Sequence, residues 1–187
     1  SVGAVIRRLS YASGHPILNA AFKVLSGGLS SQTNTTERQG IYFENTAQTL
    51  TFELIHDGEI DARQAGALCN GTTDNLTALH AAVDFQNENG GGKVYIAPNC
   101  AFDGDFIVKE GVSIIGSGMD AENASLIYLS SSAQVTFKED TTFSDIVFDA
   151  SGVDGYSGSA IKLGEDGEPL PFSLSPKGNR FRIHGHN

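Results

Sequence analysis

Tryptophan is absent from the 187-residue sequence, methionine occurs once, and cysteine occurs twice. Also missing is any run of about 18 apolar residues, the length that spans a bilayer, and the start SVGAVIRRLS lacks the apolar stretch and cleavage site of a secretory signal. The sequence therefore predicts neither a membrane span nor a signal peptide, and no membrane partner is expected. Two cysteines make no disulfide framework. A single bridge between Cys69 and Cys100 would suit their turn-like surroundings, but we expect free thiols.

Positive charge is scarce as well. Lys and Arg number 12 against 22 Asp and Glu, which gives a formal net charge of −10. A nucleic-acid-binding domain normally concentrates Lys and Arg on one face to neutralise phosphate. Nucleic acid is therefore not an expected partner, and the same balance disfavours electrostatic capture of polyanionic sugars by this segment.

Glycine is abundant by contrast. The 22 Gly, with 40% hydrophobic and 18% charged residues, describe an ordered chain with many short strands and turns. A chain of this length accommodates one modest domain and an appendage. We expect a stalk over residues 1–56 and a second unit over residues 57–187.

The first fifty residues predict a short helix and two strands. Pro16 suits the first position of a helix and Gly27 its end, so we expect a helix from Pro16 to Ser26. Its apolar stripe consists of Ile17, Leu18, Ala21, Phe22 and Leu25. Because so short a helix is marginal alone, the stripe packs either within its own domain or against the same helix of symmetry mates. Alternating apolar residues in IYFEN and QTLTFELI indicate the two strands.

A second helix is expected after the segment IDARQAGALCNGTTDN. Thr73 or Asp74 can cap its N-terminus, since either side chain can accept a free backbone N–H. Three consecutive glycines, Gly90 to Gly92, end the helix, and VYIAP then starts and stops a strand. We interpret His80 inside the helix as a packing or surface residue and the DGD at 103–105 as a turn.

This order of motifs, from Ile60 to about Gly118, resembles the opening of the pectate-lyase-like superfamily as found in phage tailspikes. The resemblance implies a mainly β fold: an N-terminal stalk or adaptor with a short helix and hairpin, then a capping helix and the first coils of a right-handed parallel β-helix. The helix would cover the apolar end of the first coil and discourage edge pairing. The resemblance further implies a homotrimeric component of the virion tail that is assembled in the host cytoplasm. Its expected partners are other tail or baseplate proteins, and host surface polysaccharide would be bound by a downstream region.

The second half of the chain has a repeating pattern. KVYI, FIVK and VSIIG follow the helix, and the same three-part order recurs at a spacing of about 35 residues. Three short strands per period, separated by turns, are typical of a three-faced parallel β-helix. Because alternate side chains point inward, we expect one ladder of Val112, Ile146 and Phe181 and another of Ile114, Phe148 and Ile183. The end at IHGHN lacks a covering segment, so we expect the front of a longer polypeptide.

Catalytic chemistry finds little support in the residues. Asp145 and Asp149 fall on one side of a predicted strand, but four extended residues separate them by about 13 Å, more than the roughly 5–9.5 Å of glycosidase carboxylate pairs. Arg180 and His184 align with them in the next coil and provide charge partners. We therefore assign no catalytic, metal or cofactor residue to this segment, although the parent chain can carry a polysaccharide depolymerase on later coils.

Homotrimerisation adds two candidate contacts to the helical stripe. Ile115 and Val147 fall on the outward side of their predicted strands and would add apolar surface to one face of the β-helix. Two other functions remain open: a secreted microbial polysaccharide lyase or hydrolase with the same fold, and a non-enzymatic surface adhesin. Fold alone does not separate these three functions.

Overall fold

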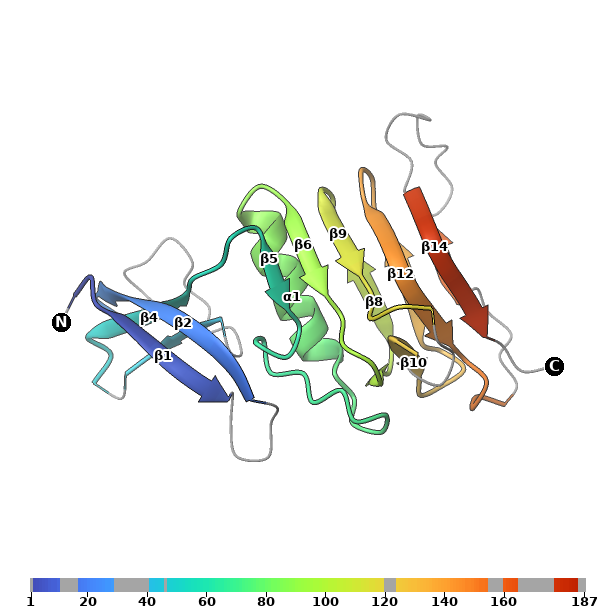
Figure 1. Ribbon diagram of the computed structural model, residues 1–187, viewed down its shortest axis with the longest axis horizontal. Coiled ribbons are helices and arrows are strands. Elements are labelled where there is room, and N and C mark those ends of the chain that lie inside the picture. The colour runs from blue at the N-terminus through green and yellow to red at the C-terminus, as the bar shows by residue number, and fades with distance from the viewer. Residues whose placement is uncertain are drawn as a thin grey trace.

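The computed structural model describes residues 2–10, 17–28, 41–45, 47–119, 124–154, 160–164 and 177–184. An antiparallel sheet at the N-terminal side leads into a stack of parallel strands, with helix α1 at the junction (Figure 1). The structure is therefore mainly β, as the sequence predicts, but it has one described helix where the sequence predicts two.

The antiparallel sheet has the strand order β1-β2-β4-β3. Its strands are β1 (Val5–Ser10), β2 (Ile17–Ser26), β3 (Tyr42–Glu44) and β4 (Leu50–Leu54). The two strands expected in IYFEN and QTLTFELI correspond to β3 and β4, which pair antiparallel. The turn between them is ordered by the Asn45 side chain, whose Oδ1 accepts hydrogen bonds from the backbone N–H groups of Thr49 and Leu50 at 2.8 and 2.9 Å.

The helix expected over Pro16 to Ser26 is wrong, because Ile17–Ser26 form strand β2. Burial alternates along the strand: Phe22 and Val24 are buried, whereas Lys23 is exposed. Pairing with β1 on one side and β4 on the other outweighs the local helical signals. The supposed stripe is consequently split between two faces, with Phe22 buried against Phe43 at 5.1 Å and Leu25 half-buried on the opposite face.

The parallel strands form three faces. The first contains β5 (Glu59–Asp61), β6 (Gly92–Tyr95), β9 (Val112–Ile115) and the first halves of β12 (Thr142–Asp149) and β14 (Lys177–His184). The second contains β7 (Cys100–Phe102), β10 (Leu126–Tyr128) and the second halves of β12 and β14. The third contains β8 (Asp105–Val108), β11 (Gln134–Phe137) and β13 (Ile161–Leu163). Every neighbouring pair is parallel, which is the arrangement of a parallel β-helix.

Strand β12 bends so that one strand serves two faces. Its residues before Asp145 pair with β9, and those after it pair with β10. Asp145 has a left-handed φ of 54°, and Arg180 has a φ of 48° at the equivalent point of β14. Gly116 lies against the bend, where a side chain would collide with the backbone of Asp145 and Ile146. A one-residue corner therefore replaces the longer loops of the earlier coils.

The inward ladders are confirmed in part. Ile146 pairs with Phe181 and Phe148 with Ile183, at the expected spacing of 35 residues. The earlier step is wrong: Ile114 pairs with Phe143, 29 residues later, so neither Ile114 nor Val112 continues into the ladders assigned to them. A fixed period fails because the first-to-second corner is a single bent residue in β12 but runs from Gly116 to Ser125 between β9 and β10.

The ladders that form are well buried. One runs through Ile60, Val94, Ile114 and Phe143, and another through Cys100, Leu126 and Phe148, each member at most 4% exposed. Phe181 and Ile183 stand at the last described coil and are 43% and 56% exposed. The core thus consists of stacked aliphatic and aromatic layers, and the last described layer is exposed because no further described coil covers it.

Helix α1 (Leu76–Glu88) covers the end of this stack. It contacts β5, β6, β8 and β9, and its buried side chains include Leu79, Val83 and Phe85. Phe85 also contacts the N-terminal part of the chain, because its ring lies 5.5 Å from that of Tyr42 and 4.6 Å from that of His56. The antiparallel sheet therefore packs on the capping helix and shares one hydrophobic core with the β-helix.

The start of α1 differs in detail from the expected cap. Asn75 precedes the first helical residue and makes no capping hydrogen bond with its side chain. Asp74 Oδ1 accepts the Leu76 N–H at 2.9 Å, so Asp74 does satisfy a free donor of the first turn. The Thr73 hydroxyl instead accepts a hydrogen bond from the Asn70 amide at 3.0 Å, and Thr73 is not a cap.

Candidate functional site

Polar side chains on one face of α1 bind strand β8 and the corner that follows it. His80 Nε2 accepts the backbone N–H of Ile107 at 3.1 Å. One turn further along, Asp84 Oδ1 lies 2.7 Å from Lys109 Nζ, and the Asn87 amide donates to the Glu110 carbonyl at 2.9 Å. Because β8 is the edge of its sheet, these contacts satisfy polar groups that would otherwise be open to another strand. His80 is thus a packing residue, as expected.

The corners after β8 and β11 repeat the same residues. Val108 pairs with Phe137, so Lys109-Glu110 and Lys138-Glu139 follow at equivalent places in consecutive coils. Each corner then takes a left-handed conformation, at Gly111 with φ 72° and at Asp140 with φ 49°. The two Lys-Glu pairs therefore stack about one strand spacing apart, roughly 4.8 Å.

A groove of about 640 Å³ lies along these corners. Its lining consists of Asn87, Ile107, Lys109, Glu110, Lys138 and Glu139. Ile107 is half-buried and supplies an apolar part of the lining. The carboxylates of Glu110 and Glu139 make no hydrogen bond or ion pair within the described ranges of the chain. The groove therefore combines free acceptors with an apolar surface, as ligand-binding clefts commonly do.

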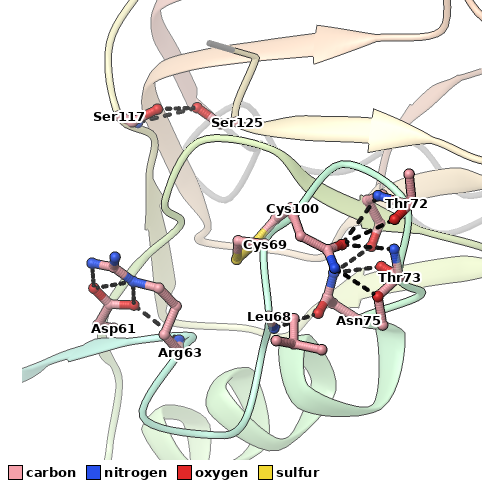
Figure 2. The surroundings of a disulfide bond; sticks show 12 residues. Asp61, Arg63, Leu68, Cys69, Thr72, Thr73, Asn75, Cys100, Ser117 and Ser125 are labelled. Carbon is pink, nitrogen blue, oxygen red and sulfur yellow. Dashed lines mark hydrogen bonds and ion pairs between the residues drawn. A yellow bond between two sulfur atoms is a disulfide. The ribbon is translucent and has the colours of Figure 1, made fainter. Parts of the chain in front are cut away.

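The two cysteines form a disulfide, so the expectation of free thiols is wrong (Figure 2). Cys69 lies in the segment before α1, and Cys100 is the fully buried first residue of β7. Hydrogen bonds hold the same two segments together: Gly71 N–H donates to the Asn99 carbonyl at 2.8 Å, and Asn75 N–H to the Ala101 carbonyl at 3.0 Å. The segment before α1 folds back onto β7, a proximity that the spacing of the cysteines does not reveal.

A second polar cluster follows β5 (Figure 2). Arg63 Nη2 lies 2.6 Å from Asp61 Oδ2, and Arg63 Nε also donates to this carboxylate. The side-chain hydrogen bond with Asp61 raises the pKa of Arg63 above its ordinary value, although burial opposes the shift. Asp61 Oδ1 also accepts the Arg63 backbone N–H at 2.9 Å. These contacts occupy the Asp61 carboxylate and stabilise the turn after β5. We therefore assign the Asp61–Arg63 pair a structural role.

Asp145 and Arg180 are partners across neighbouring coils. Arg180 Nη2 lies 2.5 Å from Asp145 Oδ1, and Asp149 stands opposite His184 in the strand register. Charge pairing therefore accounts for Asp145, as expected, but the two carboxylates are not on one straight strand because Asp145 is the bend. The Arg180 side chain is 69% exposed, so the pair contributes little to stability.

The outward apolar residues expected at a trimer contact have different environments. Ile115 is half-buried, but Val147 is fully buried and adds nothing to the outer surface. The bend at Asp145 breaks the alternation of β12, and Ile146, Val147 and Phe148 are all buried. Phe22, which was expected in the same contact, is also fully buried. Ala21 and Leu25 are half-buried, and the side chains of Ile17 and Leu18 lie outside the described residues.

Metal and membrane sites do not emerge from the described ranges. No group of three His, Cys, Asp or Glu side chains there could hold a metal ion. In the same ranges, α1 is too short and too polar to cross a bilayer.

Comparison with known proteins relates the chain to β-helical proteins of phages and bacteria. No family model matches it. Alginate lyase 7 of Azotobacter vinelandii is 36% identical over 69 residues, which are 33% of this chain and 8% of the lyase. A mannuronan C-5 epimerase A-module from the same organism has a TM-score of 0.50 at 19% identity and covers 66% of this chain and 37% of the module.

Two phage structures match more fully. The enzymatically active domain of tailspike protein 2 from bacteriophage CBA120 matches with a TM-score of 0.68 at 18% identity. The match covers 100% of this chain and 28% of the tailspike chain. Tailspike protein gp49 of Acinetobacter baumannii bacteriophage Fri1 is a capsular polysaccharide depolymerase and matches with a TM-score of 0.71 at 16% identity. The match covers 100% of this chain and 36% of the gp49 chain. The chain thus spans about a third of these tailspikes, and it has the parallel β-helix fold that they share.

Proposed function

We propose that this chain is the N-terminal part of a phage tailspike or tail fibre, which attaches to the virion and presents a β-helix to host surface polysaccharide. The carrying observation is the extent of the structural match. Both tailspikes cover 100% of the chain, including its antiparallel sheet, whereas the epimerase module leaves about a third unmatched. The fuller match therefore favours a tailspike over a protein related to the epimerase module.

Attachment to the particle is assigned to residues 1–56, and the β-helix to residues 57–187. Edge strand β1 supports the first assignment, because Val5 and Ile6 on it, like Val2 just before it, are exposed apolar residues. An exposed edge with apolar side chains is suited to pairing with another protein. The contact between Tyr42 and Phe85 then joins the attached sheet to the β-helix. Other tail or baseplate proteins are the proposed partners.

A homotrimer belongs to the same proposal. Tailspikes with this entry motif are typically three-fold, and a closed ring of three copies buries the same surface on each. Among the predicted contact residues whose burial the structure describes, Ala21 and Leu25 on the antiparallel sheet and Ile115 on the first face are half-buried and remain candidates for that surface. The virion tail is the proposed location, after assembly in the host cytoplasm.

A secreted polysaccharide lyase or hydrolase is the second candidate. The 36% identity with the alginate lyase over 69 residues supports it. The net charge of −10 opposes it, because a polyuronate would be repelled by this segment. In either case, depolymerase activity of the parent protein would depend on residues other than the ion pairs Asp61–Arg63 and Asp145–Arg180.

Immuno-electron microscopy tests the proposal directly. Antibodies raised against this 187-residue chain should label the tails of the virions that carry it. Label confined to the secreted fraction of a bacterial culture, with none on particles, would instead establish the enzyme alternative.

A further inference from the structure

We propose that the groove at the two stacked Lys-Glu corners is a binding subsite for a neutral, hydroxyl-rich saccharide. The carboxylates of Glu110 and Glu139 are its principal hydrogen-bond acceptors. This inference rests on the proposed function, since it gives the recognised polysaccharide a place on this part of the β-helix.

Free acceptors are the first argument. Neither carboxylate has a partner in the part of the chain that the structure describes, although Lys109 and Lys138 line the same groove. An ionised carboxylate offers two oxygens and can accept hydrogen bonds from adjacent hydroxyls of one sugar. Stacking of the corners sets the backbones of Glu110 and Glu139 about one strand spacing apart, roughly 4.8 Å. Consecutive sugar units of a chain along the groove could therefore each meet one carboxylate.

Preorganisation is the second argument. Lys109 is held by Asp84 at 2.7 Å, and the Glu110 carbonyl by Asn87 at 2.9 Å. Helix α1 therefore fixes the first corner, and the strand pairing of β8 with β11 fixes the second on it. A site that is ordered before binding loses less conformational entropy when its ligand arrives. Half-buried Ile107, which lies in β8 just before the first corner, adds an apolar surface for the C–H face of a pyranose ring.

Charge decides between neutral and acidic sugars. The lining contains two Lys and two Glu, and Lys109 is already neutralised by Asp84. The local excess is therefore negative, as is the net charge of −10 over the chain. Uronate polymers would be repelled, whereas a neutral saccharide carries no such cost.

The subsite is assigned binding and not cleavage. Glycosidase carboxylates flank the scissile bond in a site that excludes water, whereas Glu110 is exposed and Glu139 only half-buried. The two residues are assigned to recognition alone.

NMR titration of the whole 187-residue chain, labelled at isoleucine methyl groups and side-chain amides, tests the subsite. The probes are maltotriose, chitotriose and mannotriose as neutral sugars and trimannuronate as the acidic one. At least one neutral trisaccharide should shift the Ile107 methyl and Asn87 amide signals at millimolar concentration, and trimannuronate should not. A double Glu110→Ala, Glu139→Ala variant should bind that sugar at least tenfold more weakly. Glu59→Ala, which removes an exposed carboxylate from β5 outside the groove, should bind normally.

Each other result overturns the subsite in a recognisable way. Equal binding by the double variant and the wild type would place the sugar elsewhere on the β-helix and leave the tailspike proposal intact. The absence of shifts with all three neutral sugars, or preferential binding of trimannuronate, would refute the neutral subsite. Virion labelling, measured independently, would still decide the proposed function.

Discussion

His80 Nε2 accepts the backbone N–H of Ile107 at 3.1 Å, and this hydrogen bond joins the capping helix to the edge of the third face. The ring also lies 5.9 Å from that of Phe106, which is fully buried. The His80 side chain thus accepts the hydrogen bond that a neighbouring strand would otherwise accept from β8. The cap does more than cover apolar side chains, because it also satisfies the backbone of the first strand on that face.

Replacing His80 by Leu should destabilise the chain by about 1–3 kcal/mol, since the Ile107 N–H would lose its acceptor while remaining partly buried. Chemical denaturation monitored by circular dichroism measures the difference in free energy of unfolding. Thr77→Leu on the exposed side of α1 is the matched control and should change stability by less than about 0.5 kcal/mol. Equal effects of the two substitutions would show that the hydrogen bond is unimportant.

Breaking the disulfide between Cys69 and Cys100 should cost about 3–4 kcal/mol, the magnitude for closing a loop of 31 residues. At roughly 2–4 °C per kcal/mol for a chain of this size, the melting temperature should fall by about 10 °C. Calorimetry with and without reductant measures the shift. Cys69→Ala should melt like the reduced wild type and should not respond to reductant. A wild type that is insensitive to reductant would mean that the bond contributes no stability.

The sequence predicts the β-helix better than it predicts the register. Entry motif, capping helix and parallel coils are local patterns, and all three are found. Coil lengths are not local, because a corner can be the single residue Asp145 or the longer segment from Gly116 to Ser125. A 35-residue period therefore places Phe148 beside Ile183 correctly but misplaces Ile114.

Strand β2 shows the same limit at shorter range. Its ten residues carry an apolar stripe at helical spacing, and the pairing with the flanking strands β1 and β4 makes them a strand instead. The groove did leave a signal in the sequence. Lys-Glu occurs at 109–110 and again at 138–139, which is the true spacing of that corner, but a dipeptide gains meaning only once the strands are in register.

Phe148→Asp should destabilise the β-helix by several kcal/mol. Phe148 is fully buried, and its ring contacts those of Phe137 and Phe143, so the substitution places an unpaired charge among aromatic rings. Phe181→Asp is the control on the neighbouring strand, where the side chain is 43% exposed and the cost should be much smaller. Urea unfolding of both variants provides the comparison. Similar losses at the two positions would contradict the layered core.

The chain by itself should be catalytically silent. Asp145 is paired with Arg180, and Asp149 Oδ1 accepts the Ser151 N–H at 2.9 Å, so the two do not form a free carboxylate pair. Purified protein should release no reducing or unsaturated sugar ends from capsular polysaccharide, lipopolysaccharide or alginate. A known depolymerase treated alongside verifies the substrates. Reproducible turnover that disappears in Asp149→Asn would refute the prediction and place an active site on these first coils.

The chain should be a homotrimer in solution, with a contact on the first face of the β-helix. Ile115 is apolar, half-buried and on the outward side of β9, so a neighbouring copy could cover it. Ile115→Asp should therefore shift the species measured by light scattering towards monomer. Its folded core should persist, because the side chain does not belong to the inward ladders.

The control must separate lost assembly from lost folding. Phe22→Asp cannot locate a contact, since Phe22 is fully buried against Phe43 and its substitution should unfold the antiparallel sheet. Ser113→Asp, on the same outward side of β9 and also half-buried, carries the same added charge without removing an apolar contact. A trimer that survives Ile115→Asp would move the interface to the antiparallel sheet, where Leu25→Asp is the next test. A wild-type chain that stays monomeric at every concentration would rule out assembly through this segment.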